Sequence, residues 1–381
     1  MTGFTGMPRE VFEKRVEKMR QVVVERNLDG AFIFSDEYRP GFTTYFSDYK
    51  PINIIEESPQ GVFITPEGEV ALFLGAINAQ AAKRVSWIER IYPIDALADY
   101  FDERKQKKGD KLRIGLSGQD LLPVKYFTRL QALLVDKTYV DIDADLTAMR
   151  QIKVPEEITL LAESARIGDA ALKACIERMA NEEVTEIDLC ATAEYTLKSL
   201  GADLSCATVL SSGMNTESPT WRPTHKKIKD GEAVLIDVAP AYKGYASDVA
   251  LTVFKGKADE DQKRILRASH DTVIEAMETL KPGEPASRIY DVFLAGAKKN
   301  KVEQYFIPYA KGLRAVGHSI GLDCVERPNL DVDSTFPMTP GMTLALKFDL
   351  HGLPWGGVRI EAVMLVEDKR CRSLNRLLYE M

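Results

Sequence analysis

The sequence lacks the cysteine pairs and the excess of basic residues that mark several common protein classes. Its five cysteines are odd in number and form no CxxC pair, which argues against a disulfide scaffold and against structural zinc. The net charge of −7 gives no electrostatic basis for binding nucleic acid or an anionic membrane. We therefore expect neither nucleic acid nor membrane among the partners of this protein.

Long apolar segments are also missing. No run approaches the roughly 18 apolar residues that a membrane helix needs. The first six residues lack a basic region followed by an apolar stretch, so no signal peptide is evident. These absences favour a cytoplasmic location.

Length and patterning predict two domains. A chain of 381 residues can bury a large core, and its 45% hydrophobic and 28% charged residues are ordinary for a globular protein. Helical spacing over 9–28 is followed by β-rich runs at 30–34, 61–65 and 70–74. We expect an α/β domain over 1–150.

The second domain is predicted over 151–381, with its first helix directly after Pro155. Proline disfavours helical geometry at Val154, and Glu156 and Glu157 suit the first turn of a helix. Apolar spacing predicts helices over 156–180, 185–200, 258–280 and 286–300 and a pair of strands over 233–238 and 246–254.

Asp237 and Asp248 end the two apolar runs of that strand pair, and Gly244 lies in the turn between them. A hairpin brings such positions side by side, so that two carboxylates can share a cation or a proton. The alternative is that each aspartate is a solvated turn residue. His318, one of only four histidines, lies between Gly317 and Gly321, where small neighbours allow a ligand to approach closely.

Alternation along 343–349 places Lys347 and Asp349 on one face of a predicted strand. Arg359 and Glu361 likewise share one face of a later strand. If these strands are neighbours, Lys347 points toward Glu361. The alternative is a solvated lysine on an edge strand.

These stretches together resemble the pita-bread metallopeptidases. That family includes methionine aminopeptidase, aminopeptidase P, prolidase and the non-peptidase creatinase. The resemblance implies an α+β fold, with a pita-bread catalytic domain preceded by a smaller creatinase-type α/β domain. The family ligands are Asp, Asp, His, Glu and Glu; the matching catalytic positions here are Asp237, Asp248, His318, Lys347 and Glu361. Arg359 matches a family arginine that holds carboxylates in place without itself being a metal ligand.

Three departures from the family pattern affect the expected chemistry. Lys347 replaces a ligand carboxylate, and a protonated lysine cannot coordinate a metal. An ammonium about 4 Å from a carboxylate contributes about 4 kcal/mol at an effective dielectric near 20. Val325 replaces the second peptidase histidine, and Thr220 replaces the creatinase base, a role that His225 would take only after a loop shift. We therefore expect Lys347 to substitute for the metal and the site to need no cofactor.

The main interpretation is a metal-independent, creatinase-like hydrolase that cleaves a C–N bond in a small amide, amidine or amino-acid derivative. Asp237 or Glu361 would act as the base or the nucleophile, His318 as the acid, and Lys347 would stabilise developing negative charge. The predicted substrate contacts are Thr220, Trp221, Arg222, His225 and Val325 in the second domain and Arg39 and Tyr45 in the first. For each of these the alternative is an ordinary surface position.

Other functions remain open. One is an Xaa-Pro-type dipeptidase or aminopeptidase with one divalent metal, such as Mn, Zn or Fe, held by Asp237, Asp248 and Glu361. Another is a non-catalytic descendant that binds a small ligand, and a third is a lyase acting on a small acid. The resemblance also implies a homodimer acting on a small-molecule substrate.

Overall fold

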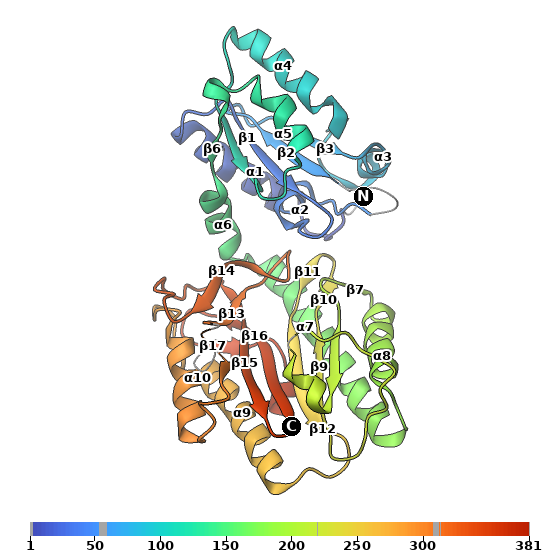
Figure 1. Ribbon diagram of the computed structural model, residues 1–381. Helices are drawn as coiled ribbons and strands as arrows, with labels where there is room; N and C mark the ends of the chain where they lie inside the picture. Colours follow the sequence, from blue (N-terminus) through green and yellow to red (C-terminus); the bar gives the residue numbers. More distant parts are fainter. Residues whose placement is uncertain (1–2, 53–58, 219, 308–311, 313, 381) are drawn as a thin grey trace. The chain divides into compact units, whose positions relative to one another are not determined.

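The computed structural model describes residues 3–52, 59–218, 220–307, 312 and 314–380. Contacts divide the chain into two compact units, Met1–Arg150 and Gln151–Met381. Helices and sheets occur in both units (Figure 1).

The N-terminal unit is built on a six-stranded mixed sheet with the order β4-β3-β2-β1-β5-β6. Its strands are β1 (Gly30–Ser35), β2 (Gln60–Ile64), β3 (Val70–Leu74), β4 (Arg90–Pro93), β5 (Ile114–Ser117) and β6 (Val140–Asp141). Its α-helices are α1 (Arg9–Glu25), α2 (Gly41–Ser47), α3 (Ala76–Val85), α4 (Leu97–Lys108), α5 (Val124–Gln131) and α6 (Asp143–Gln151). Short 3₁₀ helices are η1 (Ile94–Ala96) and η2 (Val135–Lys137).

Aromatic residues form much of the core of this unit. Phe32 of β1 and Phe63 of β2 contact Phe101 of α4, with ring centroids 5.9 and 4.8 Å apart. Burying each such side chain stabilises the fold by about 1.5–3 kcal/mol. The helix α4 is therefore attached to the sheet mainly by aromatic packing.

The second unit contains a large sheet with the order β14-β13-β15-β16-β12-β9-β8, and β17 pairs with β16 to make eight strands. These strands are β8 (Val209–Ser212), β9 (Ala233–Val238), β12 (Val249–Phe254), β13 (Ala315–Ser319), β14 (Glu326–Asp331), β15 (Thr343–Leu353), β16 (Gly356–Val366) and β17 (Cys371–Ser373). A three-stranded sheet joins β7 (Ala202–Leu204), β10 (Pro240–Tyr242) and β11 (Tyr245–Ala246).

Helices pack on one face of the large sheet, with α7 and α8 beside its early strands and α9 and α10 beside its late ones (Figure 1). The helices of this unit are α7 (Pro155–Asn181), α8 (Glu186–Ser199), α9 (Glu260–Thr279), α10 (Arg288–Lys299), η3 (Gly213–Glu217) and η4 (Leu377–Tyr379). Leu346 and Phe348 of β15 belong to this core, and the Phe348 ring lies 5.3 Å from Phe293 of α10. Because side chains alternate along a strand, Lys347 and Asp349 face the other side.

The helix α7 begins as the sequence predicts. Val154 is extended, Pro155 opens the helix, and the Glu157 carboxylate accepts a hydrogen bond from the Val154 amide at 2.9 Å. The other carboxylate oxygen of Glu157 accepts one from the Tyr245 hydroxyl at 2.9 Å. The start of α7 is therefore fixed to β11, the strand that leads directly to Asp248.

A buried ion pair fixes the turn between β13 and β14. The ammonium of Lys153 lies 2.9 Å from Glu326, and both side chains are at most 4% exposed. The backbone of Ala246 also donates to the carbonyl of Gly321 at 2.7 Å. This turn is consequently held against the segment that carries Asp248.

Replacing Lys153 by methionine is expected to lower the free energy of unfolding by about 3 kcal/mol, because the buried Glu326 loses its cation. A urea titration of the full chain measures this loss. The double replacement Lys153→Met/Glu326→Leu should recover most of it. A loss below about 1 kcal/mol in the single variant would contradict this account of the turn.

Candidate functional site

The polar face of the large sheet carries a row of chemically active side chains. Lys347 on β15 is paired directly with Glu361 on β16, and Glu361 is paired with Ala250 on β12. Ala250 is in turn paired with Asp237 on β9. The row confirms that Lys347 and Glu361 lie on neighbouring strands and share a face.

The connection between the two aspartates is more elaborate than a simple hairpin. The partner of Asp237 is Ala250 rather than Asp248, which lies just before β12. Between β9 and β12 the chain forms β10 and β11, which belong to the small sheet. Asp248 therefore approaches the polar face from the end of its strand.

The position of His318 depends on the glycine before it. Gly317 has a φ of +148°, and a Cβ there would lie 1.9 Å from the Ala345 carbonyl oxygen. The Nδ1 atom of His318 lies 3.1 Å from the carbonyl oxygen of Ser319. A carbonyl only accepts hydrogen bonds, so this contact places a proton on Nδ1 and, in the neutral ring, leaves a lone pair on Nε2.

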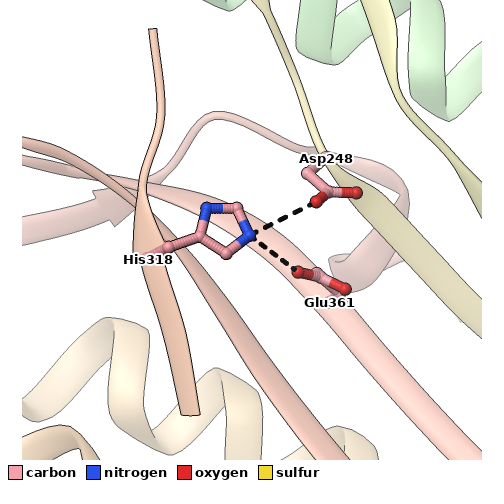
Figure 2. Close-up of side chains that lie close together, drawn as sticks. All are labelled: Asp248, His318 and Glu361. Carbon is pink, nitrogen blue, oxygen red and sulfur yellow. Dashed lines mark ion pairs between the residues drawn. The ribbon is translucent and has the colours of Figure 1, made fainter. Parts of the chain in front are cut away.

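Three ligand atoms converge where that lone pair points. The Nε2 of His318 lies 3.5 Å from Asp248 Oδ2 and 3.9 Å from Glu361 Oε1 (Figure 2). All three atoms lie within 4.8 Å of one another, and Glu361 Oε1 is buried with no hydrogen bond to any residue that the structure describes. Two oxygens and an imidazole nitrogen form a common ligand set for a divalent metal with an open position. The donors therefore fit a metal ion.

This group differs from the metal ligands predicted as an alternative, because it contains His318 in place of Asp237. Asp237 instead accepts a hydrogen bond from Arg359, whose Nη1 donates to Oδ2 at 2.6 Å. Arg359 also donates to both oxygens of Asp349, at 2.8 and 3.2 Å. Its guanidinium thus links two buried carboxylates, as the resemblance implied.

Burial and mutual repulsion shift the carboxylates of the site in opposite directions. Burial and the charge of Asp248 raise the pKa of Asp237 to about 6 and raise the pKa of Glu361 well above its usual range. Burial also acts against ionisation of Asp248. When its ring carries a second proton on Nε2, His318 donates a hydrogen bond to Asp248, and this bond and the positive charges nearby outweigh burial and lower the pKa of Asp248. The metal-free site thus retains a proton that a cation would displace.

Lys347 does not enter the point where the three ligand atoms converge. The negative charge of Glu361 raises the pKa of Lys347 and keeps the side chain cationic. However, among the residues that the structure describes, no carboxylate oxygen lies within 4.0 Å of its ammonium. The expectation that Lys347 takes the place of the metal therefore lacks the required contact.

The segment carrying four predicted substrate residues is organised by Glu186, which the sequence analysis did not identify. The buried Glu186 carboxylate accepts from the Ser212 and Thr224 amides, at 2.9 and 3.0 Å, and from the indole nitrogen of Trp221 at 3.3 Å. The indole nitrogen of Trp221 is therefore already hydrogen-bonded within the protein. A glutamate in the first turn of a helix is ordinary, so no sequence signal distinguished it.

Four of the predicted substrate contacts lie at the surface of the second unit. Thr220, Arg222, His225 and Val325 are exposed, and their proposed contact with substrate stays a prediction.

In the N-terminal unit Arg39 forms an exposed ion pair with Asp120. Tyr45 is buried and donates to the Met149 carbonyl at 3.0 Å, and its contact with substrate stays a prediction.

A cysteine also belongs to this region. The Cys324 thiol donates to Asp248 Oδ2 at 3.4 Å, a contact that the spacing of the cysteines did not predict. A thiol next to a ligand oxygen is part of the environment that orients the ligand.

Comparison with known proteins adds the family context. The model of metallopeptidase family M24 matches residues 159–368, and that of the creatinase/prolidase N-terminal domain matches residues 15–152. An Xaa-Pro dipeptidase of Pyrococcus furiosus is 26% identical over 365 residues, covering 96% of this chain and 98% of the relative.

Solved structures agree in fold. Prolidase from Pyrococcus furiosus has a TM-score of 0.80 at 24% identity, covering 94% of this chain and 99% of that one. An X-Pro aminopeptidase from Thermotoga maritima has a TM-score of 0.82 at 20% identity, covering 95% and 97%. The predicted pita-bread fold with its creatinase-type N-terminal domain is confirmed.

The prediction of a site without a cofactor is wrong. The matched family is one of metallopeptidases, and Asp248, His318 and Glu361 form a group able to hold a metal. The relatives likewise favour the peptidase alternative over the creatinase-like interpretation. No described helix is both long and apolar enough to cross a membrane. The cytoplasmic location and the homodimer stay predictions.

Metal binding in mildly acidic buffer is expected to release protons, because Glu361 must ionise to act as a ligand and its pKa is raised. For the same reason, affinity for Mn²⁺ should fall as the pH is lowered. Calorimetric titrations in two buffers of different ionisation enthalpy measure the release. Equal binding enthalpies in the two buffers would contradict the expected protonation.

Proposed function

Because the chain belongs to metallopeptidase family M24 and is therefore a hydrolase of peptide C–N bonds, we propose that it is a metal-dependent Xaa-Pro dipeptidase. The Xaa-Pro dipeptidase of Pyrococcus furiosus aligns with nearly the full length of both chains, so the likeness covers both domains. The proposal concerns small peptides as substrates.

The observation that carries the proposal is the convergence of Asp248 Oδ2, His318 Nε2 and Glu361 Oε1. With a neutral imidazole and no cation, two carboxylate oxygens would face the lone pair of His318, so the buried site needs either an added proton or a metal ion there. A divalent ion bound there supplies Lewis-acid polarisation of a peptide carbonyl. The protein supplies the fixed ligand set and a rigid sheet beneath it.

Surrounding residues hold the ligands in place. The Ser319 carbonyl fixes the ring of His318, and the Cys324 thiol donates to Asp248. The hydrogen bond from Arg359 fixes the position of the Asp237 carboxylate. Asp237, whose pKa is raised to about 6, is suited to accept or return a proton near neutral pH.

Lys347 is proposed to limit the metal content. In the resembled family the carboxylate at this position serves the metal subsite shared with Asp248, His318 and Glu361, whereas a lysine adds positive charge and no ligand. Arg359 also engages Asp237, which removes a further donor. We expect a single metal ion, and Lys347 to compensate the remaining negative charge from a distance.

The purified enzyme is expected to cleave Xaa-Pro dipeptides after loading with Mn²⁺ or Zn²⁺ and to lose activity on chelation. Glu361→Gln should lower kcat/KM on the order of a hundredfold or more, because it replaces a ligand oxygen. The matched control is Glu367→Gln, just beyond β16, where the carboxylate pairs with Arg370 and Arg372 outside the site. Full turnover in chelated enzyme would overturn the proposal.

Metal analysis by inductively coupled plasma mass spectrometry tests the role of Lys347 separately. The wild-type chain should bind one metal ion, and Lys347→Glu should retain more metal at the same free-metal concentration, because it restores a carboxylate ligand beside Glu361. Lys347→Met is the control that removes the charge without adding a ligand. Two tightly bound ions in the wild-type chain would show that Lys347 does not limit the metal content.

A further inference from the structure

Two thiols meet beside the ligand Asp248. The side chains of Cys206 and Cys324 share a hydrogen bond, and Cys324 Sγ lies 3.4 Å from Asp248 Oδ2. Both thiols are free. A continuous chain of contacts thus leads from Cys206 through Cys324 to a proposed metal ligand.

Backbone hydrogen bonds bring the two cysteines together from distant parts of the sequence. The amide of Ser205 donates to the Ala239 carbonyl at 2.8 Å, which places Cys206 against the end of β9. The amide of Ala246 donates to the Gly321 carbonyl at 2.7 Å, which holds the turn containing Cys324. The pairing of the thiols is therefore a consequence of the fold of the site.

The two thiols differ in exposure. Cys206 is exposed, whereas Cys324 is buried at 5% exposure. The other cysteines offer no equivalent arrangement, since Cys175 donates to the Leu189 carbonyl and Cys190 to Glu194. An accessible thiol beside a second, buried thiol is the arrangement typical of a reactive cysteine with its resolving partner.

We propose that Cys206 and Cys324 form a peroxide-oxidisable pair that controls the geometry of the metal site. Hydrogen peroxide would oxidise the Cys206 sulfur to a sulfenic acid, releasing one water. The Cys324 sulfur would then attack that sulfur and form a disulfide, releasing a second water. The two thiols together give up two electrons and two protons, and the peroxide is reduced to water.

Disulfide formation would change the surroundings of Asp248. The Cys324 sulfur would lose its proton and could no longer donate to Asp248 Oδ2, and it would have to move to about 2.05 Å from the Cys206 sulfur. Loss of a partner that orients a metal ligand typically weakens metal binding about 10- to 100-fold. Reduction by a dithiol would restore the donor. Only the resulting effect on catalysis rests on the proposed dipeptidase function.

Peptide mapping tests the bond itself without any activity assay. After peroxide treatment of the metal-free protein and blocking of remaining thiols, trypsin should yield residues 199–226 linked to residues 315–347. Dithiothreitol should separate them. Cys206→Ser should abolish the linkage, and the control Cys190→Ser should retain it. Oxidation of Cys206 to a sulfinic acid without linkage, or linkage through other cysteines, would overturn the proposal.

Mn²⁺ titration tests whether the disulfide weakens metal binding. The oxidised wild-type protein should bind Mn²⁺ about 10- to 100-fold more weakly than the reduced protein, whereas peroxide should leave the affinity of Cys206→Ser unchanged. Equal affinities in the oxidised and reduced wild-type protein, with the linkage present, would overturn the proposal that the cysteine pair controls the metal site. Absence of dipeptidase activity, by contrast, would count against the proposed function alone.

Discussion

An excess of buried negative charge on one face of the large sheet is the constraint on which the catalytic unit depends. Asp237, Asp248, Asp349 and Glu361 face two permanent cations, Lys347 and Arg359. Like charges a few ångströms apart in a buried site raise one another's pKa, as at Asp237 and Glu361. The site is therefore stable only with a proton or an added cation, and the convergence of three ligand atoms determines where that cation belongs.

Arg359 and Lys347 compensate this charge in different ways. Arg359 makes direct hydrogen bonds to Asp237 and Asp349, so its charge and its geometry both serve the structure. Lys347 acts on Glu361 through charge alone, because no described carboxylate oxygen lies within 4.0 Å of its ammonium. A lysine can thus replace one ligand of a metal site without replacing the metal, and its presence reduces the number of cations that the site needs.

Sequence patterns predicted the fold and most of the residues on this face. Alternation in β15 and β16 gave the shared face of Lys347 and Glu361, because the period of a strand is fixed, and the family resemblance implied that the two strands are neighbours. The metal requirement was predicted wrongly, because residue identity gives the charge of Lys347 but not the distance from its ammonium to the carboxylates. Glu186 and Cys324 were missed for a related reason: their roles arise from contacts with residues far away in the sequence, Trp221 and Asp248.

The central claim is that one divalent cation lies among Asp248, His318 and Glu361, while Lys347 and Arg359 balance the remaining charge. Anomalous X-ray diffraction from crystals grown with Mn²⁺ tests it most directly, because it locates each metal ion independently of activity. The account predicts one anomalous peak, in contact with all three ligand residues. Two peaks, with the second between Asp237 and Asp248, or no peak at this position, would contradict it.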